Sequence, residues 1–124
     1  MSPRNRASAK AAGTAFESLI TAHLREQLDD DRIERRAKHG RHDRGDIAGV
    51  RHMGGRIVIE AKDYGGRILP GPWLAEADVE RRNDDAIAGI VVAKKRGTTN
   101  PSEQYVLMTV ADLCALLTGE RVAQ

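Results

Sequence analysis

The chain has 124 residues, of which 40% are hydrophobic, 31% charged and only 3% aromatic, and its formal net charge is +2. This length suits one domain, and the scarcity of aromatic residues requires a core of Ile, Val, Leu and Ala. No apolar run is long enough for a membrane span and the charged N-terminus has no signal-peptide core, so we expect a cytoplasmic protein. The single cysteine, Cys114, excludes an intramolecular disulfide and a zinc site with several thiolates, and we expect it to be buried.

The first half of the chain predicts an arm, a helix and three strands. Residues 1–12 have no apolar periodicity and indicate a flexible basic arm, so the domain itself is expected to span residues 13–124. A helix from about residue 13 to the acidic cluster at residues 29–31 follows from apolar side chains that recur on one helical face. A strand is expected over residues 33–38. Two more are expected around residues 47–50 and 56–62, joined by a hairpin turn at Gly54 and Gly55.

The second half predicts two helices and two strands. The Gly- and Pro-rich residues 65–72 mark a loop, and Pro72 suits the first turn of a helix that ends near Asn83. Residues 88–93 indicate a buried strand and residues 104–108 another. Thr109 and Asp112 are typical of a capping box that opens a helix ending at Gly119. This order of elements predicts a small α/β or α+β domain with a central mixed β-sheet flanked by helices.

Two acidic residues adjoin the strands of the predicted hairpin. Asp46 precedes one strand, and Glu60 ends the apolar run of the next, two residues before Lys62. The hairpin brings the carboxylates together, and the spacing of two places Glu60 and Lys62 on the same face of a strand. Asp46 can simply start a strand, and Glu60 can simply pair with Lys62 on an exposed face. However, two carboxylates beside an ammonium can hold a divalent cation and activate a water, which indicates a metal-dependent nuclease.

Asp46, the spacer and Glu60-Ala61-Lys62 resemble the signature of the PD-(D/E)XK nuclease superfamily, with Gly45 in place of the usual proline. The segment from Lys10 to Glu17 is similar to the first helix of archaeal-type Holliday junction resolvases, where a basic residue and a glycine precede a glutamate. This resemblance implies a restriction-endonuclease-like core. It also implies Mg²⁺-dependent cleavage of DNA, with Mn²⁺ as a substitute, and a homodimer that cuts branched DNA in recombination or repair.

The same resemblance implies roles for individual residues. It makes Glu17, Asp46 and Glu60 the metal ligands, with the backbone carbonyl of Ala61 also available and Lys62 assisting the attacking water. Glu17 has an alternative, because Thr14 and Glu17 also fit a capping box in which the glutamate only satisfies backbone N–H groups.

Basic residues are unevenly distributed and indicate a polyanionic partner. A solvated basic loop explains the segment from residue 32 to residue 44 about equally well, and solubility at a strand end explains residues 94–96. The candidates for contact with DNA phosphates are Lys10, Arg35, Arg36, Lys38, Arg41, Arg44, Lys94, Lys95 and Arg96.

Three further features favour ordinary structural interpretations. Glu76 and Glu80 are four residues apart on the helix after Pro72, and a solvated acidic face is preferred over a role near the metal. His39 and His42 fit the basic loop better than a metal pair, and Trp73 suits the core.

Within the nuclease hypothesis, a restriction- or repair-type enzyme is the alternative to a junction resolvase. The competing classes are a non-catalytic nucleic-acid-binding module and, after it, a small protein-interaction domain.

Overall fold

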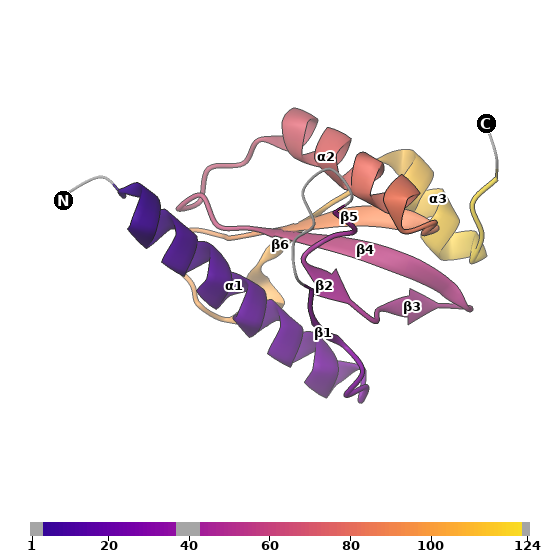
Figure 1. Ribbon diagram of the computed structural model, residues 1–124, viewed down its shortest axis with the longest axis horizontal. Coiled ribbons are helices and arrows are strands. Elements are labelled where there is room, and N and C mark those ends of the chain that lie inside the picture. The colour runs from indigo at the N-terminus through magenta and orange to yellow at the C-terminus, as the bar shows by residue number, and fades with distance from the viewer. Residues whose placement is uncertain (1–3, 37–42, 123–124) are drawn as a thin grey trace.

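A computed structural model describes residues 4–36 and 43–122 and shows an α+β domain with a mixed sheet flanked by helices (Figure 1). The helices are α1 (Arg6–Gln27), α2 (Pro70–Asn83) and α3 (Val110–Thr118), with a short 3₁₀ turn, η2 (Pro101–Glu103). The strands are β1 (Glu34–Arg35), β2 (Ile47–Ala48), β3 (Arg51–His52), β4 (Gly55–Lys62), β5 (Ala88–Ala93) and β6 (Tyr105–Leu107).

The sheet has the order β1-β2-β4-β5-β6, and β3 pairs with β4 outside this path. The central pair, β4 and β5, is parallel and runs in register from Ile57 opposite Ala88 to Lys62 opposite Ala93. The neighbouring pairs are antiparallel. The β4–β5 connection contains α2, as a crossover between parallel strands requires. The sheet is therefore mixed, as the sequence predicted.

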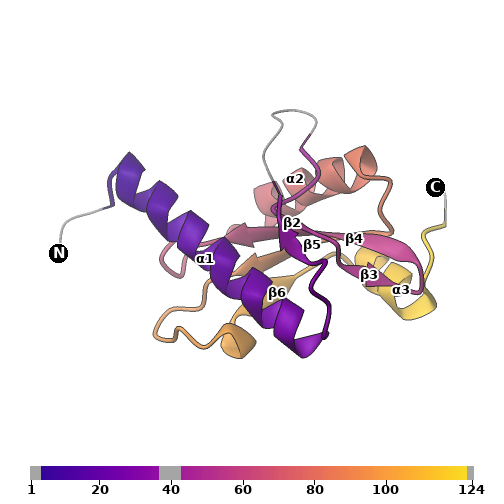
Figure 2. The same ribbon diagram turned by 60° about the horizontal axis from the view of Figure 1, so that its bottom comes forward.

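The two faces of the sheet are covered by different helices (Figures 1 and 2). On one face, Phe16 and Ile20 of α1 pack in a cluster with Ile57 and Ile59 of β4. On the other face, Trp73 and Ala77 of α2 pack with β5, and Trp73 is only 3% exposed, as expected for a core tryptophan. Because side chains alternate along a strand, every second residue of β4 faces α2. The residues of β4 on that side include Glu60 and Lys62.

Helix α1 begins at Arg6, several residues before the predicted start. The side chain of Asn5 accepts a hydrogen bond from the backbone N–H of Ser8, and the hydroxyl oxygen of Ser8 accepts one from the backbone N–H of Asn5. This capping box satisfies two of the donors that a helix start leaves free. Residues 6–12, assigned to the arm from their composition, are consequently helical. Thr14 and Glu17 lie inside the helix, so the capping alternative for Glu17 was wrong.

Smaller differences concern the turn, the edge strands and the cysteine. The hairpin turn lies at Met53 and Gly54, both with positive φ (52° and 85°), and Gly55 already belongs to β4. Strand β6 is shorter than predicted, and of the strand predicted over residues 33–38 the structure shows Glu34–Arg35, with residues 37 and 38 outside the described residues. Cys114 is exposed rather than buried, because the inner side of the short α3 is taken by Asp112 and Ala115.

In the part of the chain that the structure describes, no helix is long and apolar enough to cross a membrane.

Candidate functional site

Asp46 is held against β4 by its own backbone and side chain. Its backbone N–H donates to the carbonyl of Ile59 at 2.9 Å, and its Oδ2 accepts from the N–H of Ala61 at 2.9 Å. At Gly45 the backbone has a φ of +99°, and a Cβ added there would lie only 2.8 Å from Val58 Cγ1 of β4. Proline cannot adopt this φ, which accounts for a glycine where the resembling motif has proline. The predicted proximity of Asp46 to the Glu60–Lys62 segment is thus present.

Glu60 and Lys62 lie on the α2 side of β4, as their spacing predicted. The Lys62 ammonium is 3.7 Å from Glu60 Oε2 and donates a 2.9 Å hydrogen bond to Glu76 Oε2 of α2. Glu60 is only 2% exposed, and its burial beneath α2 comes from its place in the central strand. The ion pair between Glu60 and Lys62 is therefore part of a buried site and not of an exposed strand face.

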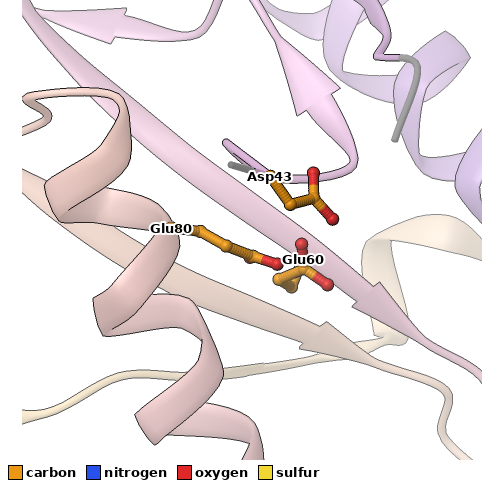
Figure 3. Close-up of side chains that lie close together, drawn as sticks. All are labelled: Asp43, Glu60 and Glu80. Carbon is orange, nitrogen blue, oxygen red and sulfur yellow. The ribbon is translucent and has the colours of Figure 1, made fainter. Parts of the chain in front are cut away.

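A third carboxylate and a fourth belong to the same site. One oxygen each of Asp43, Glu60 and Glu80 lies within 4.8 Å of the other two. Figure 3 shows the three side chains converging from different elements: Glu60 from β4, Glu80 from α2 and Asp43 from the segment before β2. Glu80 is 3% exposed, so the solvated helix face expected for this glutamate was wrong. Glu76, one turn earlier, has a side chain that is 45% exposed.

Hydrogen bonds from two sides hold the backbone around Asp43 in place. The side-chain amide of Asn83, at the end of α2, donates to the carbonyl of Asp43 at 2.9 Å. The guanidinium of Arg36 donates to the carbonyl of Arg44 at 2.7 Å and lies 3.4 Å from the buried carboxylate of Asp84. The segment that carries Asp43 is thereby attached to the C-terminal end of α2.

Burial of these acids changes their protonation. The pKa of Glu60 is raised from 4.5 to about 11, mainly by burial and also by the adjacent carboxyl of Glu80 and the charge of Asp46, while Lys62 acts in the opposite direction. Burial likewise raises the pKa of Glu80 to about 7; the contact with Glu60 opposes this rise, and the charges of Glu76 and Asp43 add to it. Carboxylates crowded in this way hold protons unless a cation neutralises them.

Lys62 shows the opposite balance. Burial alone lowers the pKa of its ammonium, but the hydrogen bond and charge of Glu76, together with the charge of Glu60, raise the pKa above its usual 10.5. Lys62 is consequently a cation at neutral pH, able to attract an anionic group and unable to accept a proton.

The carboxylate cluster has the composition of a divalent-cation site. Glu60 Oε1, Glu80 Oε2 and Asp43 Oδ1 are buried oxygens that accept no hydrogen bond within the described residues. Oxygen ligands of this kind suit hard cations such as Mg²⁺, Mn²⁺ or Ca²⁺. The three acidic residues can therefore hold a metal ion.

Glu17 has a different partner. Its Oε2 accepts hydrogen bonds from Arg35 Nε at 3.3 Å and Nη2 at 3.1 Å. Its position on α1 places it in the wall of a cavity together with Ala61 and Lys62. Of the predicted ligand set, Glu17 and Ala61 share the wall of this cavity and Asp46 bonds the N–H of Ala61, whereas Glu60 lies in the carboxylate cluster with Asp43 and Glu80.

The cavity that contains Glu17 has a volume of about 620 Å³ and a basic lining. Tyr64, in its wall, packs edge-to-face on Trp73 with ring centroids 5.0 Å apart, which fixes the loop after β4. Arg4 bonds both the carbonyl and the carboxylate of Asp63 in that loop. The charged residues of the lining are Arg4, Lys10, Arg35, Arg36, Lys62 and Arg67 on the basic side, and Glu17 and Asp63 on the acidic side.

The predicted DNA-contacting residues separate into groups. Lys10, Arg35 and Arg36 line the cavity, whereas Arg44 lies 3.8 Å from Asp84 outside its lining. The ammonium of Lys94 donates to the carbonyls of Lys95 and Thr98, and Arg96 Nε donates to the carbonyl of Gly65. Lys38 and Arg41, with His39 and His42, lie outside the described residues.

Sequence reasoning missed Asp43 and Glu80 as members of the acidic site. The available signal was the spacing of Glu76 and Glu80 on a helix directly after the strand that carries Glu60 and Lys62. In a crossover between two parallel strands, that helix must pack back over the sheet. An acidic residue on the side of this helix that faces the sheet, here Glu80, then lies beside the carboxylate of Glu60. For Asp43, in an irregular segment, no comparable periodicity exists.

Models of protein families, curated proteins and solved structures were each compared with the chain, and none matches it.

Proposed function

We propose that this protein is a Mg²⁺-dependent DNA endonuclease with a restriction-endonuclease-like core, acting on four-way junctions. The observation that carries the proposal is the position of Lys62. Its ammonium lies 3.7 Å from the buried Glu60 carboxylate, and the same side chain lines the basic cavity. A cation site and a polyanion site therefore meet at one residue.

The basic cavity supports a nucleic-acid substrate. Six of its charged lining residues are basic and two are acidic, on a chain whose overall net charge is only +2. Such a local excess of positive charge attracts phosphates, because each Arg or Lys side chain can pair with a phosphate and neutralise its charge. Backbone contacts of this kind position a strand and carry no sequence information, which suits an enzyme that recognises DNA by shape.

The acidic side supports hydrolysis. Asp46 and Glu60 would hold Mg²⁺, which when bound activates a water and stabilises charge on the phosphate. Lys62, kept cationic by Glu76 and Glu60, attracts the non-bridging oxygens of the phosphate and stabilises their charge in the transition state. Asp46 is fixed by the N–H of Ala61, so its position does not depend on the substrate.

The preference for junctions and the assembly as a homodimer derive from the resemblance to resolvases. Each chain carries one carboxylate site of this kind in its described residues, and symmetric cutting of two strands requires two sites. A restriction- or repair-type nuclease with the same site chemistry would instead cut linear DNA, and a non-catalytic module would bind DNA without cutting it.

A cleavage assay tests the proposal. A synthetic four-way junction, a linear duplex and single-stranded DNA are incubated with wild type, with Asp46→Asn and with Lys62→Ala, in Mg²⁺ and in EDTA. We expect symmetric nicking of the junction in Mg²⁺ alone, lowered by at least about a hundredfold in each variant. Sedimentation of the protein with the junction measures whether two copies bind.

Asp78→Asn is the matched control, because Asp78 lies on the outer part of α2 and pairs with Arg81 and Arg82. It should cut as wild type does. Cutting of linear DNA would support nuclease activity but contradict the preference for four-way junctions. Binding without any cutting would favour the non-catalytic module, and full activity of Asp46→Asn would refute the site.

A further inference from the structure

We propose that Glu80 of α2 and Asp43 of the segment before β2 are direct ligands of the divalent cation, together with Glu60. The cation site is then completed by α2 and not by Glu17 of α1. The inference rests on the proposed function only for what the cation does, namely DNA cleavage. The identity of the residues that bind the cation is tested separately, by metal binding without DNA.

Burial without compensation is the first argument. Glu60 and Glu80 are 2% and 3% exposed, and Glu60 Oε1 and Glu80 Oε2 accept no hydrogen bond from the described residues. A polar atom that is desolvated and unsatisfied destabilises the fold, and two adjacent carboxylates add mutual repulsion. Lys62 compensates only in part, because it is nearer to Glu76 (2.9 Å) than to Glu60 (3.7 Å). A divalent cation would satisfy the remaining charge.

Geometry is the second argument. The three ligand oxygens lie within 4.8 Å of one another. Oxygens on opposite sides of a divalent cation are separated by twice the metal–oxygen distance, or roughly 4–5 Å for Mg²⁺ to Ca²⁺. Figure 3 shows the carboxylates directed toward a common point from a strand, a helix and a loop. The cluster therefore has the dimensions of a coordination site before any ion binds.

The support around the ligands is the third argument. Glu80 belongs to a helix, and Glu60 to the central strand. Asp43 is in an irregular segment, but Asn83 bonds its carbonyl at 2.9 Å and is itself one turn from Glu80 on α2. This bond fixes the backbone of the segment beside α2 and thereby limits where the carboxylate of Asp43 can lie. Asn83 is thus a positioning residue for Asp43.

Glu17 lacks these features. Its carboxylate accepts two hydrogen bonds from Arg35 and lines the basic cavity. A guanidinium already neutralises this charge, so a cation would have to displace Arg35 to bind Glu17. Substituting Glu17 and Glu80 in parallel therefore shows whether α1 or α2 supplies a ligand of the cation.

Mn²⁺ titration followed by electron paramagnetic resonance measures the binding, on the full chain without DNA. The proteins are wild type, Glu80→Gln, Asp43→Asn, Glu17→Gln and, as a control on the same helix, Asp78→Asn. We expect Glu80→Gln and Asp43→Asn to bind Mn²⁺ about tenfold or more weakly than wild type, since ligand-shell changes commonly have this effect. Glu17→Gln and Asp78→Asn should bind as wild type does.

Thermal unfolding excludes loss of folding as the cause. Without metal, Glu80→Gln should melt at or above the wild-type temperature, because the substitution removes a crowded charge. Added Mn²⁺ should raise the wild-type Tm through mass action and raise that of Glu80→Gln much less.

Equal Mn²⁺ affinity of wild type and Glu80→Gln would overturn the inference, as would wild type that binds no Mn²⁺ at millimolar concentration. A loss confined to Glu17→Gln would move the third ligand to α1. These results leave the proposed function to the cleavage assay, in which Asp46 and Lys62 are the variants.

Discussion

The two faces of β4 serve different purposes. On one face, Ile57 and Ile59 belong to the apolar cluster that α1 covers. On the other face, Glu60 and Lys62 lie beneath α2, with Glu76 and Glu80 above them. A single strand of eight residues thus carries the core and the candidate site on alternate side chains.

This difference shows which residues serve the fold. Burial of Ile59 at 2% exposure stabilises the domain by removing apolar surface from water. Burial of Glu60, also at 2%, has the opposite effect unless its charge is neutralised. Equal exposure therefore has opposite consequences for stability on the two faces, and the costly face is the one that suggests a function.

The first prediction separates the faces by stability. Ile59→Ala removes buried methyl and methylene groups from the α1 face and should lower the free energy of unfolding by about 2–5 kcal/mol. Urea denaturation followed by circular dichroism measures the change. Val106→Ala is the control, because Val106 is 52% exposed at the sheet edge and should change the free energy of unfolding by less than about 0.5 kcal/mol. Equal losses in the two variants would show that the α1 face is not the main core.

The alternation of side chains along β4, which creates its two faces, could be predicted from the sequence. Glu60 and Lys62 are two residues apart in an otherwise apolar strand, and the structure places both on the α2 side. The strand Ala88–Ala93 was predicted at its observed bounds because its apolar run is continuous, as in a strand buried on both faces. Thr109 and Asp112 form the predicted capping box, since that signal is local.

Contacts between residues far apart in the sequence could not be predicted in this way. Glu80 joined Glu60 through the packing of α2 on the sheet, and periodicity alone does not say which side of a weakly amphipathic helix faces inward. The start of α1 at Arg6 depended on the capping box of Asn5 and Ser8, which the basic composition of the segment concealed. The partner of Glu17, Arg35, comes from a strand of only two residues. For Glu80 and Glu17 tertiary contacts decided what composition left open, whereas for the start of α1 a local capping signal was present and was outweighed by the basic composition.

The second prediction concerns the acidic face and its dependence on pH. In the absence of metal, Glu60 has a pKa of about 11 in the folded protein against 4.5 in its ordinary state, so the folded protein retains a proton that the unfolded chain releases. The folded state binds more protons above pH 4.5, and the free energy of unfolding must fall as pH rises. Glu80, with a pKa of about 7, adds to this fall up to neutral pH.

Glu60→Gln should remove much of that pH dependence. The amide is neutral at every pH and can donate to the carboxylate of Glu80, so the variant should be more stable than wild type at pH 8 in EDTA and close to it at pH 4. The expected gain is about 1–2 kcal/mol, or several degrees in Tm, measured by thermal unfolding across pH. A variant that is less stable than wild type at pH 8 would show that ionised Glu60 is well compensated by Lys62.

The third prediction has the smallest effect and concerns the basic cavity beside Lys62. Arg67→Ala removes one cavity charge and should weaken binding of a four-way junction, with the slope of log K against log salt reduced in magnitude by about 0.9. Fluorescence anisotropy in EDTA, at several salt concentrations, measures this slope without cleavage. Arg82→Ala is the matched control, because Arg82 is an arginine on α2 with a side chain that is 71% exposed, paired with Asp78 outside the cavity lining. The control should leave the slope unchanged, since a charge that is paired with Asp78 and lies outside the cavity lining does not neutralise a phosphate there. Equal reductions in both variants would mean that DNA responds to net charge alone, and the cavity would lose its assignment as the path of the strand.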